Sequence, residues 1–380
     1  MSQHFEHGLA RIKDLSVRTA VDKRGKTEVC EMFLEGRSLR PTNRFWNSLH
    51  LRFGFTGNIF RYFTHAEVFA RISKVAPNDS FRWCVEKNAK GDRLLAVTAP
   101  GASLIAYDDL VGLLKDYAAE EIKYSDGYVR SKHAPRCDGT FQVAGDKFQN
   151  KFVIDAPIDG FGRPAVYLSL LRLVCSNGAV GFSPAFRSEL NVGRGDDGGT
   201  FALLRVLEGF NNEDGYAAMR QRFESAATSW ASVGEVNRLG KVLTRLHGRG
   251  ELKGARPARG GDGAAEVPPG SPLFTAFHRM TGDLSHIYGL ANLEALSAKR
   301  QRTLPAACKV YDLLNFVSEV ATHHATPAGE RALQAHLGDL ISAEYDLEGT
   351  VEHFDDWQDF FVDNEATAKT VAGLNRRGRR

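Results

Sequence analysis

The stretch "LLRLVCSNGAVG", residues 170–181, places a cysteine between an apolar run and a turn. A thiol becomes a nucleophile where a nearby base and an accessible, electropositive setting favour its thiolate. Cys175 instead ends the apolar run "AVYLSLLRLV", has no histidine near it in the sequence, and is followed by the turn signal Asn177-Gly178. We therefore predict a buried thiol, whose replacement by serine lowers stability more than any activity. Periodicity leaves open whether residues 165–175 form a strand or a helix.

A second candidate is the aromatic-basic segment at residues 44–71, "RFWNSLHLRFGFTGNIFRYFTHAEVFAR", in which the first acidic residue is Glu67. Arginines of such a segment can follow phosphates while its rings stack on bases. Alternatively, the rings belong to the core and the arginines extend from it to solvent. The candidate nucleic-acid contacts are Arg44, Arg52, Arg61, Phe53 and Tyr62, with Arg376 and Arg377 of the C-terminal tail.

Other clusters of polar residues give weaker signals for catalysis or metal binding. The adjacent histidines at 323 and 324 would point in different directions from a helix, and the acidic stretch around His353 offers only pairs of ligands on separate faces. Asp155 and Asp159 flank a proline, and a pair of carboxylates could act in acid-base catalysis. Alternatively, these acids bond the backbone of a turn, as they commonly do in such stretches. The glycine-rich residues 191–200 lack the Lys-Ser/Thr of a phosphate loop. We predict no catalytic residue, metal ligand or cofactor, and this favours a protein that is not an enzyme.

The motif at residues 172–178, "RLVCSNG", resembles the Arg-Val-Val-Cys-x-Asn signature of a phage/plasmid-like protein family, the domain of unknown function number nine hundred and thirty-two. "FVIDAPIDG", 152–160, and "YDLLNFVSEVATHH", 311–324, resemble two further stretches of that family, and the similarity spans roughly residues 44–345. The chain has Ile158 where many members have histidine, and Gly178 where many have threonine. The resemblance implies a gene of a mobile element and no established reaction. It also implies a structural role for Arg172, Cys175, Asn177 and Gly178.

Composition is that of a water-soluble globular protein, with a net charge of +3. Five scattered cysteines without a C-x-x-C pair argue against a disulfide framework and a cysteine zinc site. The amino-terminal residues lack the apolar region of a signal peptide, and no apolar run is long enough to cross a membrane. We therefore expect a protein of the bacterial host cytoplasm with no membrane partner. An acidic stretch at 352–365 before the basic tail makes nucleic acid or a second copy of the chain the candidate partners.

The expected fold class is α+β, with a mixed N-terminal body followed by long helices and a helical C-terminal portion. Strands are expected near 28–34, as a hairpin at 80–99, and at 127–133, 140–145 and 151–158. Helices are expected after the capping box Thr64-x-x-Glu67, over 103–118, over 214–246 as one helix or two, over 309–324, and from Thr326-Pro327 onward.

The expected domain organisation is an N-terminal arm at 1–43, an α+β core at 44–200, a helical segment at 201–247, a Gly/Pro/Arg linker at 248–270, a helical portion at 271–374 and a basic tail at 375–380. The leading functional hypothesis is nucleic-acid binding, preferably to single strands, in the DNA metabolism of a mobile element. The alternative is a structural or assembly protein of a phage particle or oligomer.

Overall fold

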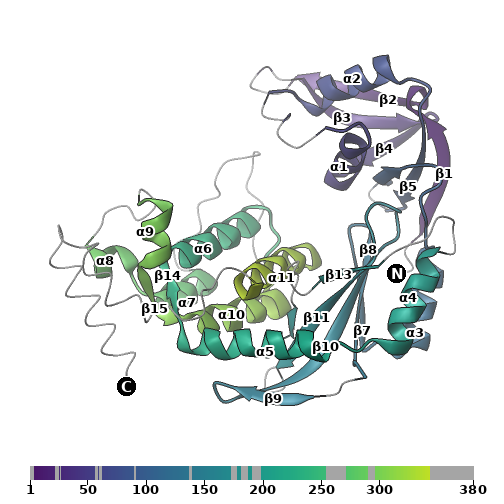
Figure 1. Cartoon of the computed structure of the whole chain (residues 1–380). Helices are drawn as coiled ribbons and strands as arrows, with labels where there is room; N and C mark the ends of the chain where they lie inside the picture. Colours follow the sequence, from purple (N-terminus) through teal and green to yellow (C-terminus); the bar gives the residue numbers. More distant parts are fainter. Residues whose placement is uncertain are drawn as a thin grey trace. The chain divides into compact units, whose positions relative to one another are not determined.

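A computed structural model describes residues 4–21, 25, 27–55, 59, 62–89, 91–136, 139–172, 178–180, 187–190, 198–253, 271–289 and 296–342. The chain forms two compact units (Figure 1). Unit 1 comprises Met1–His133, Ile154–Val166 and Glu189–Phe210, and unit 2 comprises Ala134–Val153, Tyr167–Ser188 and Asn211–Arg380. The fold class is α+β as predicted, with a sheet-rich N-terminal body and C-terminal helices.

Unit 1 is built on a six-stranded sheet in the order β1-β5-β6-β4-β3-β2. All neighbouring strands are antiparallel except β4 and β6, which are parallel. The strands are β1 Phe5–Arg11, β2 Leu15–Val21, β3 Thr27–Leu34, β4 Arg37–Pro41, β5 Ser80–Glu86 and β6 Arg93–Thr98, with a 3-10 turn at Ile12–Asp14. The sequence predicted the hairpin β5-β6 and strand β3, but only that one strand within residues 1–43. It missed β1 and β2 because these are the two edge strands and most of their side chains are exposed or half-buried, which leaves little apolar alternation.

Two helices pack with this sheet to form the core of unit 1. Thr42 caps α1, Asn43–Arg52, and the predicted capping box of Thr64 and Glu67 opens α2, His65–Val75. Phe45 and Leu49 on α1 are fully buried, and each such side chain stabilises the fold by about 1.5–3 kcal/mol. Most of the described aromatic rings of the aromatic-basic segment, residues 44–71, therefore pack in or against the hydrophobic core of unit 1.

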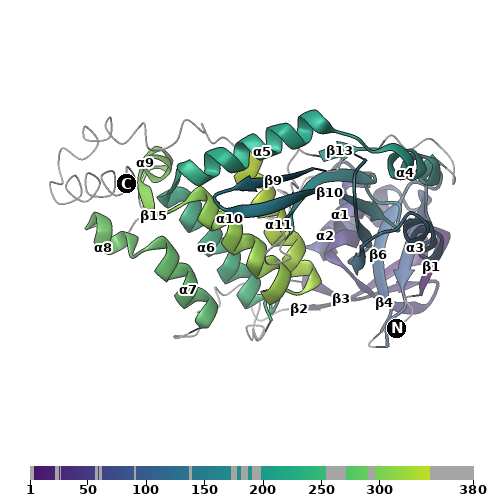
Figure 2. The same ribbon diagram turned by 90° about the horizontal axis from the view of Figure 1, so that it is seen from below.

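Two long strands contribute residues to both units. These strands are β10 Asp146–Pro157 and β11 Ala165–Arg172, which settles the open choice at 165–172 in favour of a strand. The hairpin of β7 Glu121–Ser125 and β8 Tyr128–His133 also belongs to unit 1. Helices α3, Tyr107–Asp116, and α4, Gly198–Gly209, lie next to each other in both views (Figures 1 and 2).

Unit 2 contains the first part of β10, to which β9 Thr140–Val143 pairs, and the end of β11, to which β12 Gly178–Val180 pairs. A short strand β13, Arg187–Glu189, also pairs with β11. Helix α5, Glu213–Thr228, packs along β9 (Figure 2). Its Phe223 packs edge to face on Phe148 of β10, with the ring centres 5.5 Å apart. The predicted helix at 214–246 is two helices, because β14, Trp230–Ser232, separates α5 from α6, Val233–Gly248. Ser232 and Glu235 form a capping box that starts α6.

The C-terminal part of unit 2 is mainly helical, as predicted. Its elements are α7 Pro272–Thr281, α8 Leu284–Tyr288, α9 Ala298–Thr303, β15 Pro305–Lys309, α10 Val310–Glu319, a π-turn at Val320–His324 and α11 Pro327–Ser342. The sequence missed β15, which pairs with β14. None of the helices in the described residues combines the length and apolar character that crossing a bilayer requires.

A stack of three rings lies between α1 and the start of α2. Trp46 stacks on His65 at 4.6 Å, and the rings of His65 and His50 are parallel at 5.4 Å. Burial, assisted by the neighbouring His65, lowers the pKa of His50 to about 4, and burial also lowers the pKa of His65. Both imidazoles are therefore neutral in the folded protein at pH 7.

We predict that unit 1 loses stability on acidification through His50. Because the folded-state pKa is about 4 and the unfolded value about 6.5, the unfolded chain binds the extra proton, so stability falls as pH drops from 6.5 to 4. His50→Phe should remove about 1–2 kcal/mol of the difference in unfolding free energy between pH 7 and pH 5. Urea unfolding at both pH values measures this, with His286→Phe, at an exposed histidine of α8, as the control. An unchanged pH dependence in His50→Phe would contradict the prediction.

Candidate nucleic-acid interface

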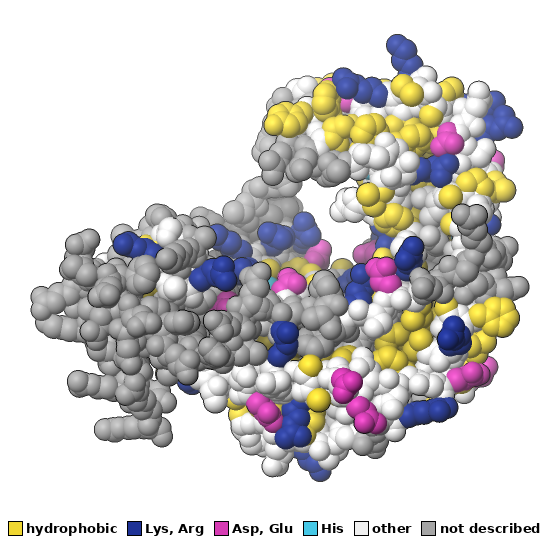
Figure 3. Space-filling view, viewed as in Figure 1, with side chains coloured by type: hydrophobic (Ala, Val, Ile, Leu, Met, Phe, Trp, Pro, Cys, Tyr) yellow, Lys and Arg dark blue, Asp and Glu magenta, His cyan; other side chains and the backbone are white. Residues whose placement is uncertain are grey.

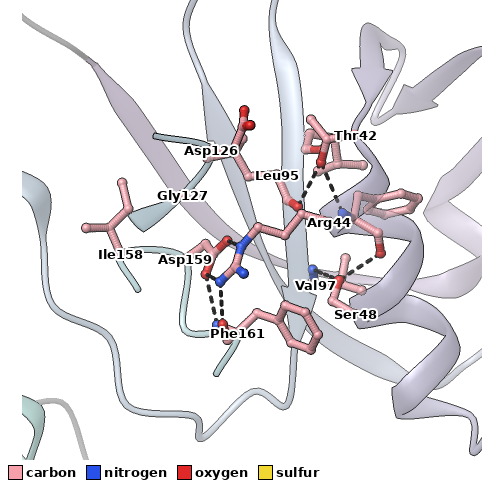
Figure 4. A network of polar contacts seen from close by, with 12 residues as sticks. Thr42, Arg44, Ser48, Leu95, Val97, Asp126, Gly127, Ile158, Asp159 and Phe161 are labelled. Carbon is pink, nitrogen blue, oxygen red and sulfur yellow. Dashed lines mark hydrogen bonds and ion pairs between the residues drawn. The ribbon is translucent and has the colours of Figure 1, made fainter. Parts of the chain in front are cut away.

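Arg44, the first predicted contact, is held inside unit 1. Its guanidinium binds both carboxylate oxygens of Asp159, with Nη2 at 2.7 Å from Oδ1, and also donates to the carbonyl of Phe161 (Figure 4). The Arg44 side chain is 13% exposed and the Asp159 side chain 0%. Arg44 was predicted to bind nucleic acid, but this ion pair occupies it, because a buried carboxylate needs a close cation.

Aromatic rings enclose the Arg44 guanidinium on its remaining sides. Its central carbon lies 4.0 Å from the ring centre of Tyr128 and 4.9 Å from that of Phe161, in cation–π contact. Burial lowers the pKa of Arg44, but the hydrogen bonds and charge of Asp159 outweigh burial and leave the pKa above its ordinary value. Arg44 is thus a permanent cation within the fold.

Gly127 sits against this ion pair at the turn between β7 and β8. Its φ of +84° is in the region that favours glycine, and a Cβ there would lie 2.6 Å from Oδ2 of Asp159 and 2.9 Å from Nε of Arg44. Asp159 also accepts a hydrogen bond from the backbone N–H of Phe161, 3.0 Å away. The alternative explanation of Asp159, as an acid that organises a turn, is therefore the one that its contacts support.

The other predicted contacts of the aromatic-basic segment differ in their surroundings. Arg52 donates to Asp79 at 2.9 Å and to the carbonyl of Ser80 at 2.7 Å, and Phe53 packs against the core. Tyr62 is 81% exposed. Arg61, Arg376 and Arg377 lie outside the described residues. Arg44, Arg52 and Phe53 thus have partners within the protein, and the described residues of the segment do not form one outward surface.

Arg172, from the cysteine motif, belongs to a polar network in unit 2. Its Nη2 lies 2.6 Å from Oδ1 of Asp146, and the hydroxyl of Tyr311 donates to Oδ2 of the same carboxylate at 2.6 Å. Burial and the charge of Asp146 raise the pKa of Tyr311, so its hydroxyl remains a donor. Two stretches that carry the family resemblance, 172–178 and 311–324, therefore meet at one carboxylate. Gly178 begins β12, whereas Cys175 and Asn177 lie outside the described residues, as does the acidic stretch around His353.

The exposed side of α6 is a line of cations that the sequence analysis did not single out. Arg238, Lys241, Arg245 and the C-cap residue Arg249 are all exposed, and they follow one another at intervals of three, four and four residues. This spacing places them on one side of the helix, which we call the basic face of α6. No acidic residue occurs between Arg238 and Arg249 in the sequence. The spacing alone could have revealed this face.

The opposite side of α6 fixes the direction in which the basic face points. Val236, Leu239, Leu243 and Leu246 are buried, so the helix is amphipathic and its cations face solvent. Helix α9, which packs on α6, carries the exposed Arg300 and Arg302. Figure 3 shows dark blue Lys and Arg side chains gathered over the helices of unit 2. The arrangement offers several phosphate-binding cations on a rigid support.

Comparison of the chain with protein-family models, curated proteins and solved structures found no match. The resemblance to the phage/plasmid-like family therefore stays a prediction from residues 152–160, 172–178 and 311–324. Among the clusters of cationic side chains described above, the basic face of α6 is the one directed outward.

We predict strong coupling between Arg44 and Asp159. Arg44→Met alone or Asp159→Leu alone leaves a buried charge without its partner and should cost about 3–5 kcal/mol of unfolding free energy. The double variant should cost clearly less than the sum, because both charges are gone. Urea unfolding of the four proteins gives the coupling energy.

The pair Arg52 and Asp79 provides the matched control, since the Asp79 side chain is 39% exposed. Its double-mutant cycle, with Arg52→Met and Asp79→Ala, should give a coupling of about 0–1 kcal/mol. Equal coupling in the two cycles would contradict the role assigned to Arg44.

Proposed function

We propose that this chain is a nucleic-acid-binding protein of phage or plasmid type, and that the basic face of α6 holds the phosphate backbone. The observation that carries the proposal is the line of Arg238, Lys241, Arg245 and Arg249 on a rigid helix. Such cations release counterions from the phosphates on binding, which supplies affinity without reading the base sequence.

Single strands are the favoured ligand. The sequence continues from Arg249 into "GELKGARPARGG", which adds Lys253, Arg256 and Arg259 among glycines. Arginine-glycine segments hold single-stranded nucleic acid through charge and stacking. The mobile-element context rests on the resemblance of residues 172–178, and DNA metabolism is the process that this context suggests.

A charge-removal series tests the interface. We expect labelled single-stranded DNA to bind in fluorescence anisotropy, with an affinity that falls steeply as salt rises. Arg238→Gln/Arg245→Gln/Arg249→Gln should weaken binding roughly tenfold or more at low salt and reduce the slope of log affinity against log salt by about 2, from three phosphate contacts at about 0.7 each. The control is Lys13→Gln/Lys74→Gln/Lys115→Gln, which removes the same charge from exposed positions of unit 1.

An equal loss in both triple variants would mean that net charge, not the basic face, attracts the DNA. Absence of binding at low salt would reject the proposal. A rise of mass with concentration in the absence of binding would instead support the alternative function, assembly of copies of this chain. Tighter binding to duplex than to single strands would keep the interface and reject the preference for single strands.

A further inference from the structure

Residues 352–365, which we call the acidic segment, carry the charge that complements the basic face of α6. The acidic segment reads "EHFDDWQDFFVDNE" and contains six acidic residues and no lysine or arginine. The basic face carries exposed cations, and no acidic residue lies between its first and last members in the sequence. Dense charges of opposite sign attract each other, most strongly at low salt. The two parts of the chain are therefore electrostatically complementary.

Helix α11, which ends at Ser342, brings the chain back along α6. The two helices pack on each other and lie next to each other in Figures 1 and 2. At the start of α11, the N–H of Thr326 donates to the carbonyl of Glu251, which follows α6, at 2.9 Å. Further along α11, burial and the charge of nearby Arg238 lower the pKa of His336. The chain therefore reaches Ser342 at the end of unit 2 where α6 begins.

The residues between α11 and the acidic segment are numerous enough to reach every cation of the basic face. Glu352 is 10 positions after Ser342. An extended chain spans at most about 3.3–3.6 Å per residue, which allows a separation of about 35 Å. Helix α6 has 16 residues, and at a rise of about 1.5 Å per residue it is about 24 Å long. The acidic segment is thus within reach of the basic face of the same molecule.

The acidic segment also has the chemistry of the ligand proposed for the basic face. Carboxylates alternate with the rings of Phe354, Trp357 and Phe360, much as phosphates alternate with bases in a single strand. Arginine binds carboxylate and phosphate with the same planar geometry and also contacts rings. A segment of the same molecule acts at an effective concentration on the order of millimolar. Individually weak contacts therefore suffice to hold it.

We propose that the acidic segment binds the basic face of α6 in the same molecule and competes there with nucleic acid. The contact follows from charge and reach, whereas the competition rests on the function proposed for the basic face. A polyanion must displace the acidic segment before it can bind. The acidic segment thereby lowers the apparent affinity for every polyanion, and most for short ones, which make few phosphate contacts.

A direct test of the contact needs no nucleic acid. Asp355→Asn/Asp356→Asn/Asp359→Asn/Asp363→Asn, the amide variant, neutralises most of the acidic segment in the full chain with little change of side-chain size. We expect a labelled peptide of residues 352–365 to bind the amide variant at low salt in fluorescence anisotropy. The unaltered chain should bind the peptide roughly fivefold or more weakly, because its own acidic segment occupies the basic face.

Two charge-removal variants locate the peptide. Adding Arg238→Gln/Arg245→Gln/Arg249→Gln, the α6 triple variant, to the amide variant should abolish peptide binding. The matched control adds Lys13→Gln/Lys74→Gln/Lys115→Gln, which removes the same charge from exposed positions of unit 1. Peptide binding to this control should stay within about twofold, since exposed charges far from the contact are screened.

A second test measures the competition with labelled single-stranded DNA. The amide variant should bind the DNA roughly fivefold or more tightly than the unaltered chain, with a gain that shrinks as salt rises. In the α6 triple variant the same four substitutions should give almost no gain, because no basic face remains to be uncovered. The control for net charge is Glu28→Gln/Glu35→Gln/Asp109→Asn/Asp116→Asn, which neutralises four exposed acids of unit 1 and should give almost no gain.

Several results would overturn the proposal. These are no peptide binding to the amide variant, peptide binding that survives in the α6 triple variant, or an equal gain in DNA affinity from the unit 1 acids. A rise of mass with concentration that the amide variant loses would place the acidic segment on a second copy of the chain and reject the contact within one molecule.

Failure of this proposal and failure of the proposed function give different results. Peptide binding that requires the α6 cations, without any DNA binding, would keep the contact and reject the nucleic-acid function. DNA binding that requires the α6 cations, but is the same in the amide variant and the unaltered chain, would keep the function and reject the competition.

Discussion

The buried ion pair between Arg44 and Asp159 is the constraint on which unit 1 depends. The two residues are 115 positions apart, one at the start of α1 and the other in the turn after β10. A carboxylate with 0% exposure is tolerable only with a cation and further donors around it, and the guanidinium and the Phe161 N–H supply them. The Tyr128 ring and the absence of a side chain at Gly127 follow from the same requirement for space and contact. One charge pair thus accounts for the types of residue found in three separate stretches of the sequence, which are the start of α1, the turn between β7 and β8, and the turn after β10.

Cations elsewhere in the chain differ from Arg44 in how exposed they are to solvent. A guanidinium that is already paired within the fold cannot exchange its partner for a phosphate without leaving a buried carboxylate alone, which costs more than a surface contact returns. The cations of the basic face of α6 are exposed, and they stand opposite a buried apolar stripe. This difference, and not the density of arginines in a segment, decides which surface can attract a polyanion.

The sequence predicted the helices and strands whose stabilising contacts join residues that are close together in the chain. The capping box at Thr64, the β5-β6 hairpin and the helix that starts at Pro327 could all be predicted, because each depends on residues within a few positions. Strand β1 and the pair β14-β15 could not, since their partners are distant in the sequence. Strand β2 pairs with the adjacent β3, but most of its side chains are exposed, which leaves little apolar alternation to indicate a strand. The contacts of Arg44 in the aromatic-basic segment could not be predicted for the same reason as strand β1. The sequence shows Arg44 beside aromatic rings, but the partner that decides its role is Asp159, far along the chain.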